Sequence, residues 1–324
     1  MTRPHLLALA VTGSGLLASS AMAATLGTNA TAYALGNEGR TLVTVATPGG
    51  GAATGVTLSF AGGAMTSLDA LAFRPMTGQL YGYDDEGDTV YEVNMTTGVA
   101  TAVVTNMNAT TNDDLGFDFN NVLDAARIVT AEEENVVFFP NNAPPTLEPK
   151  TKLAFVAGDP NEGANPNIVM NAYTNAVPMA TSTTQYVIDS DWNILATLGN
   201  NAGTLETVGE LFLDDMPFDL TEDGGFDILS FSEGDNTAFA LLTMGGMQAI
   251  YEVPLMADGM GRVNLSFVTA VDGSFGTLDG FAVVAGAGGP NPSLPPVPVP
   301  ASLGLLGTGV AVLAAWRRFG SRRA

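Results

Sequence analysis

Residues 68–104 read LDALAFRPMTGQLYGYDDEGDTVYEVNMTTGVATAVV, and this stretch decides the fold. It holds four short apolar runs rich in the β-branched and aromatic residues typical of strands: 71–73, 79–83, 89–93 and 99–103. The segments between them supply the Gly, Asn or Asp of tight turns: 75–78, 84–88 and 94–98. The stretch therefore predicts a four-stranded antiparallel meander. Such a sheet cannot bury both of its faces alone, so copies are expected to stack on it, as propeller blades do.

Similar runs recur along the chain, with first strands expected near residues 68, 115, 168, 225 and 278, a spacing of roughly 45 to 57 residues that is typical of blades. The run at 278–284 has no strands after it, and the runs at 31–35, 41–45 and 55–60 lack a first strand. Pairing 278–284 with 33–35 would complete one blade and close the ring.

The sequence thus predicts an all-β propeller of about five four-stranded blades, closed by its N- and C-terminal strands. In the copy that begins near residue 115, the fourth strand is expected at 153–156, after a Pro-rich segment. The loop regions 140–166 and 199–222 are long enough to hold further strands, which leaves six blades as the alternative.

Composition excludes several classes of chemistry. The chain has 324 residues, 46% apolar and 14% charged, enough for a sizeable core. It has no cysteine, which removes disulfides, thiolate catalysis and Cys-based zinc sites. Its one histidine, His5, lies in a stretch expected to be removed. The mature chain would therefore have no imidazole for a catalytic triad or a metal cage.

Charge is distributed unevenly. All 33 acidic residues lie between Glu38 and Asp279, a span that holds only six of the 11 basic residues. A surface this negative repels nucleic acid and anionic lipid headgroups, and it favours cations or cationic partners. We therefore expect no nucleic-acid partner, and membrane contact only through a C-terminal helix.

The first 23 residues are typical of a secretory signal peptide. Arg3 gives the positive start, residues 6–17 an apolar core, and Ala21 and Ala23 a cleavage site before Ala24. The propeller is expected to occupy residues 24–285. A Pro/Gly-rich linker, 286–298, follows it and should be extended.

The remaining segment, 299–324, has the composition of a membrane anchor. Residues 299–316 are uncharged and would span about 27 Å as a helix. The cluster that begins with Arg317 and Arg318 is expected to stay in the cytoplasm, which places the propeller on the far side of the membrane.

The order Pro298, Val299, Pro300, Ala301, then an apolar helix, then an arginine cluster, resembles the PEP-CTERM sorting signal of Gram-negative bacteria, with Val299 where those signals usually have Glu. The resemblance implies that an exosortase-type membrane protease cuts near these residues. The protein would then pass from a transient inner-membrane anchor to the cell surface or the extracellular matrix. The alternative is a permanent single-pass anchor.

The body resembles a secreted family catalogued as domain of unknown function 4394, which is grouped with β-propellers. The resemblance lies in four stretches: 71–81, 116–120, 172–175 and 203–209. It implies a propeller fold and no established activity.

Acidic residues are the main candidates for site chemistry. Asp84, Asp85 and Asp88 form the best calcium candidate, with weaker ones at 112–114 and 222–224, because turns offer carboxylates and carbonyls together. The ordinary β-turn is the alternative. No other cofactor is indicated.

Two arginines fall on or beside predicted strands. We expect Arg74 and Arg127 to pair with aspartates of the repeat, such as Asp69, Asp118 or Asp227, and not to hold a ligand. The sequence does not indicate any catalytic residue by itself.

The favoured function is an exported, non-enzymatic surface or matrix protein whose propeller binds an extracellular polysaccharide or a surface protein. The rival hypothesis is a secreted glycan hydrolase that uses two carboxyl groups, one as acid and one as base or nucleophile.

Replacing Pro298, Val299 and Pro300 with alanine should trap the full-length precursor in the inner membrane, because the protease would lose its recognition sequence. Mass spectrometry of the surface fraction measures this. Recovery of mature wild-type protein that still carries Arg317 and Arg318 would contradict processing and favour the permanent anchor.

Overall fold

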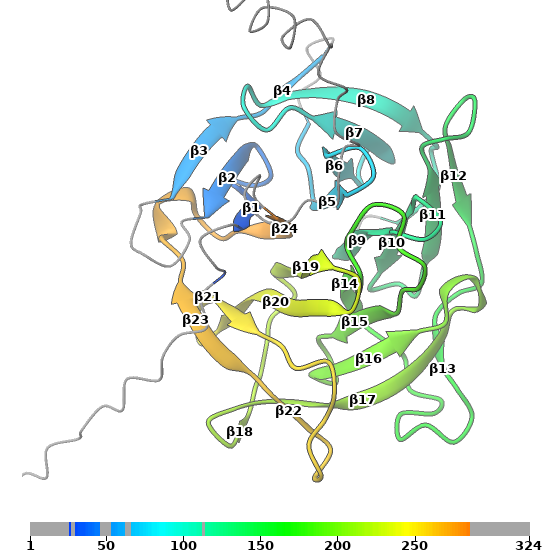
Figure 1. Ribbon diagram of the computed structural model, residues 1–324, viewed down its shortest axis with the longest axis vertical. Helices are drawn as coiled ribbons and strands as arrows, with labels where there is room; N and C mark the ends of the chain where they lie inside the picture. Colours follow the sequence, from blue (N-terminus) through cyan, green and yellow to red (C-terminus); the bar gives the residue numbers. More distant parts are fainter. Residues whose placement is uncertain (1–25, 27–29, 46–52, 62–65, 112–113, 286–324) are drawn as a thin grey trace, which may run out of the picture.

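The computed structural model describes residues 26, 30–45, 53–61, 66–111 and 114–285, and it is almost entirely β-structure. The strands form five sheets arranged as a propeller-like ring around one axis (Figure 1). The sheet that contains both ends of the described chain has the order β24 (Asp279–Ala285), β1 (Ala30–Gly36), β2 (Thr41–Val45) and β3 (Thr54–Thr57).

The next two sheets contain the meander of residues 68–104 and the copy that follows it. The first has the order β5 (Ala70–Arg74), β6 (Gln79–Asp84), β7 (Thr89–Val93), β8 (Val99–Thr105) and β4 (Ser59–Phe60). The second consists of β9 (Leu115–Asn120), β10 (Ala125–Thr130), β11 (Asn135–Phe139) and β12 (Thr146–Pro149).

The last two sheets complete the ring. One has the path β14 (Ile168–Tyr173), β15 (Gln185–Asp189), β16 (Ile194–Leu198), β17 (Thr204–Leu213) and β13 (Ala154–Phe155), with β18 (Met216–Pro217) and β22 (Arg262–Asn264) paired to β17. The other consists of β19 (Gly224–Ser232), β20 (Asp235–Met244), β21 (Met247–Glu252) and β23 (Ser266–Ala270). Two single-turn 3-10 helices, η1 (Asn200–Ala202) and η2 (Gly273–Phe275), lie in connections.

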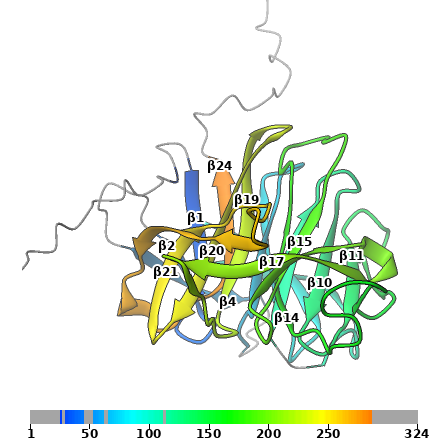
Figure 2. The ribbon, with the colours of Figure 1, turned by 90° about the horizontal axis from the view of Figure 1, so that it is seen from below.

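Five inner strands surround the axis, each being the first strand of its sheet: β5, β9, β14, β19 and β24. Each contacts the next, and β24 contacts β5 again. The first residues of all five line one small axial hollow. We call the end of the ring with this hollow the hollow face. The opposite end, where the inner strands finish, we call the turn face (Figure 2).

The predicted closure of the ring is confirmed. β1 and β24 are antiparallel, with Ala32 opposite Val283, Tyr33 opposite Ala282 and Ala30 opposite Ala285. Both ends of the described chain therefore meet at the turn face. This pairing leaves no bare inner edge at the junction, which is how a closed sheet ring avoids edge-to-edge association.

Glycines let the inner strands approach one another closely. A Cβ atom on Gly116 would lie 2.5 Å from the backbone nitrogen of Asn171 on the next inner strand. One on Gly225 would lie 2.6 Å from the backbone nitrogen of Phe281, again on the next inner strand. The inner strands thus pack backbone against backbone near the hollow face, where a side chain has no room.

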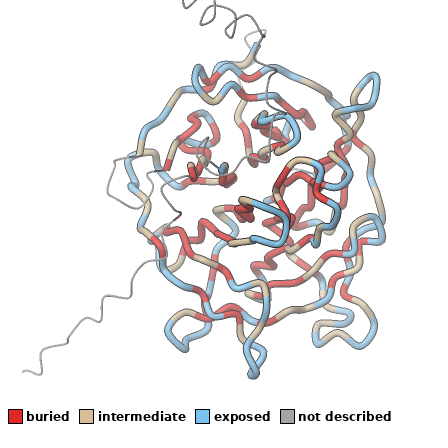
Figure 3. The backbone as a smooth tube through the Cα atoms, viewed as in Figure 1, coloured by how far each residue is buried: buried red, intermediate tan, exposed pale blue. Residues whose placement is uncertain are grey.

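The core is divided among the junctions between sheets. Each of five buried apolar clusters contains residues of neighbouring sheets, for example Tyr83 and Phe117, which join β6 to β9. Figure 3 shows that burial follows the strands around the axis, while exposed residues lie mainly in turns and along the outer strands. The aromatics Phe117, Phe226 and Phe281 of three inner strands are buried, and Phe73 of β5 is partly buried.

The outer strands differ from the sequence-based expectation. The fourth strand of the sheet that begins at β9 is β12, not 153–156. Residues 154–155 form β13, which instead runs parallel to the start of β17 in the next sheet. The two long loop regions therefore add strands to existing sheets. The physical reason is that outer strands of neighbouring sheets meet at the rim, where short segments pair wherever a free edge lies nearby.

Three predicted segments fall outside the described residues: the signal peptide, the linker 286–298 and the sorting segment 299–324. Within the described ranges, the structure contains no helix long and apolar enough to cross a bilayer. These three expectations remain predictions.

Replacing Gly116 with alanine should lower the free energy of unfolding by about 1–3 kcal/mol, because the new methyl group would overlap the backbone of β14. Gly259→Ala is the matched control, since nothing lies within 4 Å of the position its Cβ would take. Denaturant titration of both variants measures the difference. Equal stability of the two would show that the inner strands do not need this close packing.

Candidate functional site

The axial hollow is a concavity at the centre of the ring. Its lining comes from the first residues of the inner strands, among them Leu71, Phe117, Met170 and Phe226, and its volume is about 10 Å³, room for roughly one water molecule. Ligand pockets of small-molecule enzymes are typically about 300–1,000 Å³. The hollow is therefore small for a sugar ring together with its catalytic groups.

Two buried aspartates lie on inner strands just past the hollow. The Asp118 carboxylate accepts a hydrogen bond from the backbone N–H of Tyr173 at 2.7 Å. Asp227 accepts from the backbone N–H of Val283 at 2.6 Å and of Ile228 at 2.6 Å. Each carboxylate thus ties its own inner strand to the next one around the ring, β9 to β14 and β19 to β24.

Burial changes the acidity of these carboxyls. It raises the pKa of Asp118 well above the usual range, and the nearby charge of Asp227 raises it further. Burial likewise raises the pKa of Asp227, while its backbone hydrogen bonds oppose the shift. The pair has the raised pKa that a general acid needs, but both side chains are enclosed by protein.

Further carboxyls stand where inner strands begin. Asp69 accepts from the backbone N–H of Asp85 at 2.9 Å, and Asp279 accepts from that of Gly224 at 2.9 Å. Burial raises the pKa of Asp279 to about 6 and, together with contacts to Asp85, that of Asp69 to about 7. The hollow face is thus surrounded by acidic groups that bond to backbone amides.

The calcium candidate does not form a shared ligand set. Asp88 accepts hydrogen bonds from the hydroxyl of Tyr83 at 2.9 Å and from the backbone N–H groups of Thr110 at 2.9 Å and Asn108 at 2.6 Å. Asp84 accepts from the hydroxyl of Thr66 and from the backbone N–H of Gly87.

Asp85 is buried, and its backbone N–H bonds to Asp69. The candidate stretch therefore holds a turn and its neighbouring loop in place. Within the described residues, no three acidic or histidine side chains gather as metal ligands.

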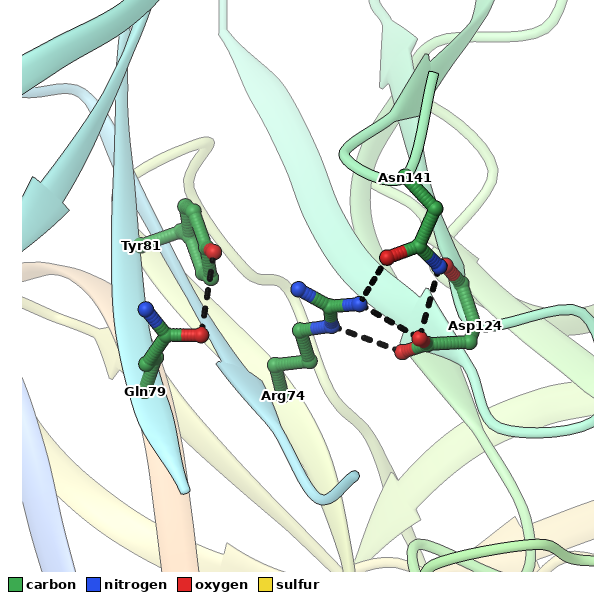
Figure 4. Close-up of polar contacts among 5 residues, drawn as sticks. All are labelled: Arg74, Gln79, Tyr81, Asp124 and Asn141. Carbon is green, nitrogen blue, oxygen red and sulfur yellow. Dashed lines mark hydrogen bonds and ion pairs between the residues drawn. The ribbon is translucent and has the colours of Figure 1, made fainter. Parts of the chain in front are cut away.

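The Arg74 cluster joins the sheets of β5 and β9 on the turn face (Figure 4). Nε of Arg74 donates to Asp124 at 2.7 Å, and Nη2 donates to the other oxygen of Asp124 and to Asn141 at 2.7 Å. Asn141 in turn donates to Asp124 at 2.8 Å. Burial opposes the shift, but the guanidinium keeps the pKa of Asp124 below its usual value. Nearby, Tyr81 donates to Gln79 at 3.3 Å.

The second arginine is buried among neutral groups. Arg127 donates to the hydroxyl of Tyr173 at 3.1 Å, to Asn201 at 2.8 Å and to Asn135. It lies opposite Asp118 in the ladder of β9 and β10, yet no carboxylate of the described residues forms an ion pair with it.

The expected arginine partners were therefore wrong in both cases, since neither arginine pairs with Asp69, Asp118 or Asp227. The partners of Arg74, and one partner of Arg127, lie in connections between strands, while Tyr173 and Asn135 lie in β14 and β11. Asp124 has φ 50° in the turn after β9, and Asn141 and Asn201 lie in later connections. Sequence periodicity carries no signal for such residues, because they do not recur from one copy to the next.

These clusters make hydrogen bonds within the protein and hold sheets together. Their geometry suits a rigid scaffold, and they leave the exposed turns and rims as the surfaces that can meet a partner.

Residues 41–266 match the family described as "Domain of unknown function (DUF4394)". A search of curated proteins found no match.

Solved structures similar to the chain are only distantly related. The nidogen/laminin complex has 10% identity and a TM-score of 0.44, covering 79% of this chain and 99% of that chain. An auxiliary nutrient binding protein from Bacteroides ovatus has 13% identity and a TM-score of 0.40, covering 64% of this chain. A Lactobacillus plantarum protein has 12% identity and a TM-score of 0.39, covering 75% of this chain and 82% of that one.

The chain spans 55% of the length of the Bacteroides ovatus protein. With TM-scores of 0.44 and below, these likenesses say nothing about what the chain binds.

The carboxyls fall into two groups with opposite effects on the pH dependence of stability. Burial raises the pKa of the first group: Asp69, Asp118, Asp189, Asp227 and Asp279. In the second group, hydrogen bonds lower the pKa: Asp88, Asp124, Glu148, Asp159, Glu233 and Asp258. The folded protein thus binds more protons than the unfolded chain between about pH 4 and 7, so stability falls as pH rises through this window.

The melting temperature should therefore be highest near about pH 4–5 and fall toward pH 8. Asp227→Asn should flatten this fall, because it removes one group that takes up a proton on folding. Asp159→Asn is the control, since the stabilisation by Asp159 is lost only below about pH 4. Calorimetry from pH 4 to pH 8 measures the slopes, and a wild-type melting temperature that rises across this range would contradict the prediction.

Proposed function

The chain belongs to the family described as a domain of unknown function (DUF4394), and we propose that it is an exported, non-enzymatic binding scaffold of the cell surface or extracellular matrix. The proposal rests on one observation: among the described residues, the polar clusters that could supply chemistry make their bonds within the protein. A ring stiffened in this way presents its turns in fixed positions, which lowers the entropic cost of binding.

The axial carboxyls give the strongest support for a structural role of these polar clusters. Asp118 and Asp227 bond to backbone amides of the neighbouring inner strands, and the hollow next to them has room for roughly one water molecule. A glycosidase needs two carboxyls that face a bound sugar from opposite sides. Carboxyls that are enclosed by protein and already accept hydrogen bonds from backbone amides support a structural role.

Export and anchoring are part of the same proposal. The signal peptide at 1–23 and the sorting segment at 299–324 would bring the protein across the inner membrane of a Gram-negative bacterium and hold it there until an exosortase-type protease acts. Ala30 and Ala285, the last paired residues of the closing strands, meet at the turn face. We assign the hollow face, at the other end of the ring, as the side that meets partners.

The rival function is a carboxylate-dependent glycan hydrolase, and one observation favours it. Burial, together with the nearby charge of Asp227, raises the pKa of Asp118, as in a general acid. Opening of the ring at the hollow face would be required before a glycan could reach the pair.

The full-length protein in detergent, mixed with insoluble polysaccharides, separates the two functions. The scaffold should sediment with at least one polysaccharide and release no reducing ends. Sustained release that is lost in Asp118→Asn or Asp227→Asn, and kept in Asp159→Asn, would overturn the proposal in favour of the hydrolase.

A further inference from the structure

An exposed tryptophan stands on the hollow face. Trp192 lies in the turn between β15 and β16, is 46% exposed, and is the one tryptophan of the described residues. Its backbone N–H donates to Asp189 at 2.9 Å, and its ring nitrogen donates to the backbone carbonyl of Asn165 at 3.2 Å. The indole is thus held at its polar edge while much of its surface remains open to solvent.

Two carboxylates are held together beside this turn. The side-chain amide of Asn167 donates to Glu222 at 2.9 Å and to Asp191, the residue before Trp192, at 3.2 Å. Asn167 directly precedes β14, and Glu222 lies just before β19, so the group joins two neighbouring sheets. Both acids are exposed, and none of the four ion pairs among the described residues involves either.

The backbone of this turn is already bonded within the protein. The N–H of Ser190 donates to the carbonyl of Asn167 at 3.0 Å, and the carbonyl of Asn193 accepts from Leu211 at 2.8 Å. Peptide partners usually need a free strand edge or a groove for their main chain. The turn therefore offers a partner side chains only, namely one flat indole and two carboxylates. These groups favour a ligand that is recognised by the faces of its own rings and by the substituents on them.

From this arrangement we propose that Trp192, Asp191 and Glu222 form a contact site for a polysaccharide that carries amino sugars. The C–H face of a pyranose packs on the indole, and the carboxylates accept charge-assisted hydrogen bonds from its ammonium group. The formal net charge of −22 attracts such a polycation over long range. This inference rests on the proposed function, since it names the ligand class of the proposed scaffold.

The test uses the full-length protein in detergent and three sets of oligosaccharides: β-linked glucosamine, its fully N-acetylated form, and neutral glucan. Calorimetric titration should show the glucosamine form binding most tightly, with an affinity that falls as salt is added. Trp192→Ala should lower this affinity roughly tenfold, and Trp192→Phe less, because phenylalanine keeps an aromatic face. The double variant Asp191→Asn with Glu222→Gln should remove the preference over the N-acetylated form.

Matched controls address non-specific effects. Phe267→Ala removes an aromatic side chain that is 49% exposed on the outer strand β23, and Asp235→Asn removes an exposed charge on β20. Both variants should bind the glucosamine oligosaccharide with an affinity within about twofold of wild type, since surface substitutions away from the site have small effects. Melting curves of every variant check that the ring remains folded.

The outcomes separate this inference from the proposed function. Polysaccharide binding that is equally strong in Trp192→Ala would overturn the site and leave the scaffold standing. Equal affinity for the amino and N-acetylated forms would overturn the amino-sugar assignment. Absence of binding to every polysaccharide would overturn the inference, and turnover in place of binding would overturn the scaffold as well.

Discussion

Close approach of the inner strands at the axis is the constraint on which the structure depends. A ring with so few sheets has a small radius, so its innermost strands meet backbone to backbone and leave no space for side chains at their starts. Gly116 and Gly225 satisfy this requirement, and Asp118 and Asp227 bond across the same junctions. Packing and polar bonding therefore act at the same places, and the five apolar clusters fill the wider spaces farther out.

Much of this architecture could be predicted from sequence, because it follows from local patterns. The meander of residues 68–104 has alternating apolar runs and turn residues, and its strands form where the pattern places them. Closure of the ring by residues 278–284 could be predicted because this run resembles a first strand with no strands after it. The three N-terminal runs lack a first strand, so the two parts together make one complete sheet. The same reasoning failed for residues 153–156. Two of them, Ala154 and Phe155, pair with β17 of the next sheet and not with the sheet that begins at β9. Pairing at the rim depends on how strongly each sheet twists, which the order of residues does not reveal.

The polar clusters were harder to predict for a related reason. Arg74 binds Asp124 and Asn141, which belong to connections of the neighbouring sheet, and Arg127 binds Asn201 in a connection far along the chain. The expectation of arginine–aspartate pairs within the repeat assumed that partners would recur with the repeat. Likewise, nothing in the sequence indicated a binding site at Trp192. A single tryptophan in a turn indicates such a site only when its exposure and the acids beside it are known.

Closure by β24 also determines the order in which the protein can reach its native state. The pairing of Ala30 with Ala285 joins residues far apart in the chain, so the ring cannot close until its final strand has been made. Until then β1 and β19 each lack a neighbour, and the partly folded chain exposes strand edges that invite association. A protein built in this way would benefit from isolation from other chains until its last strand arrives, because isolation protects those edges.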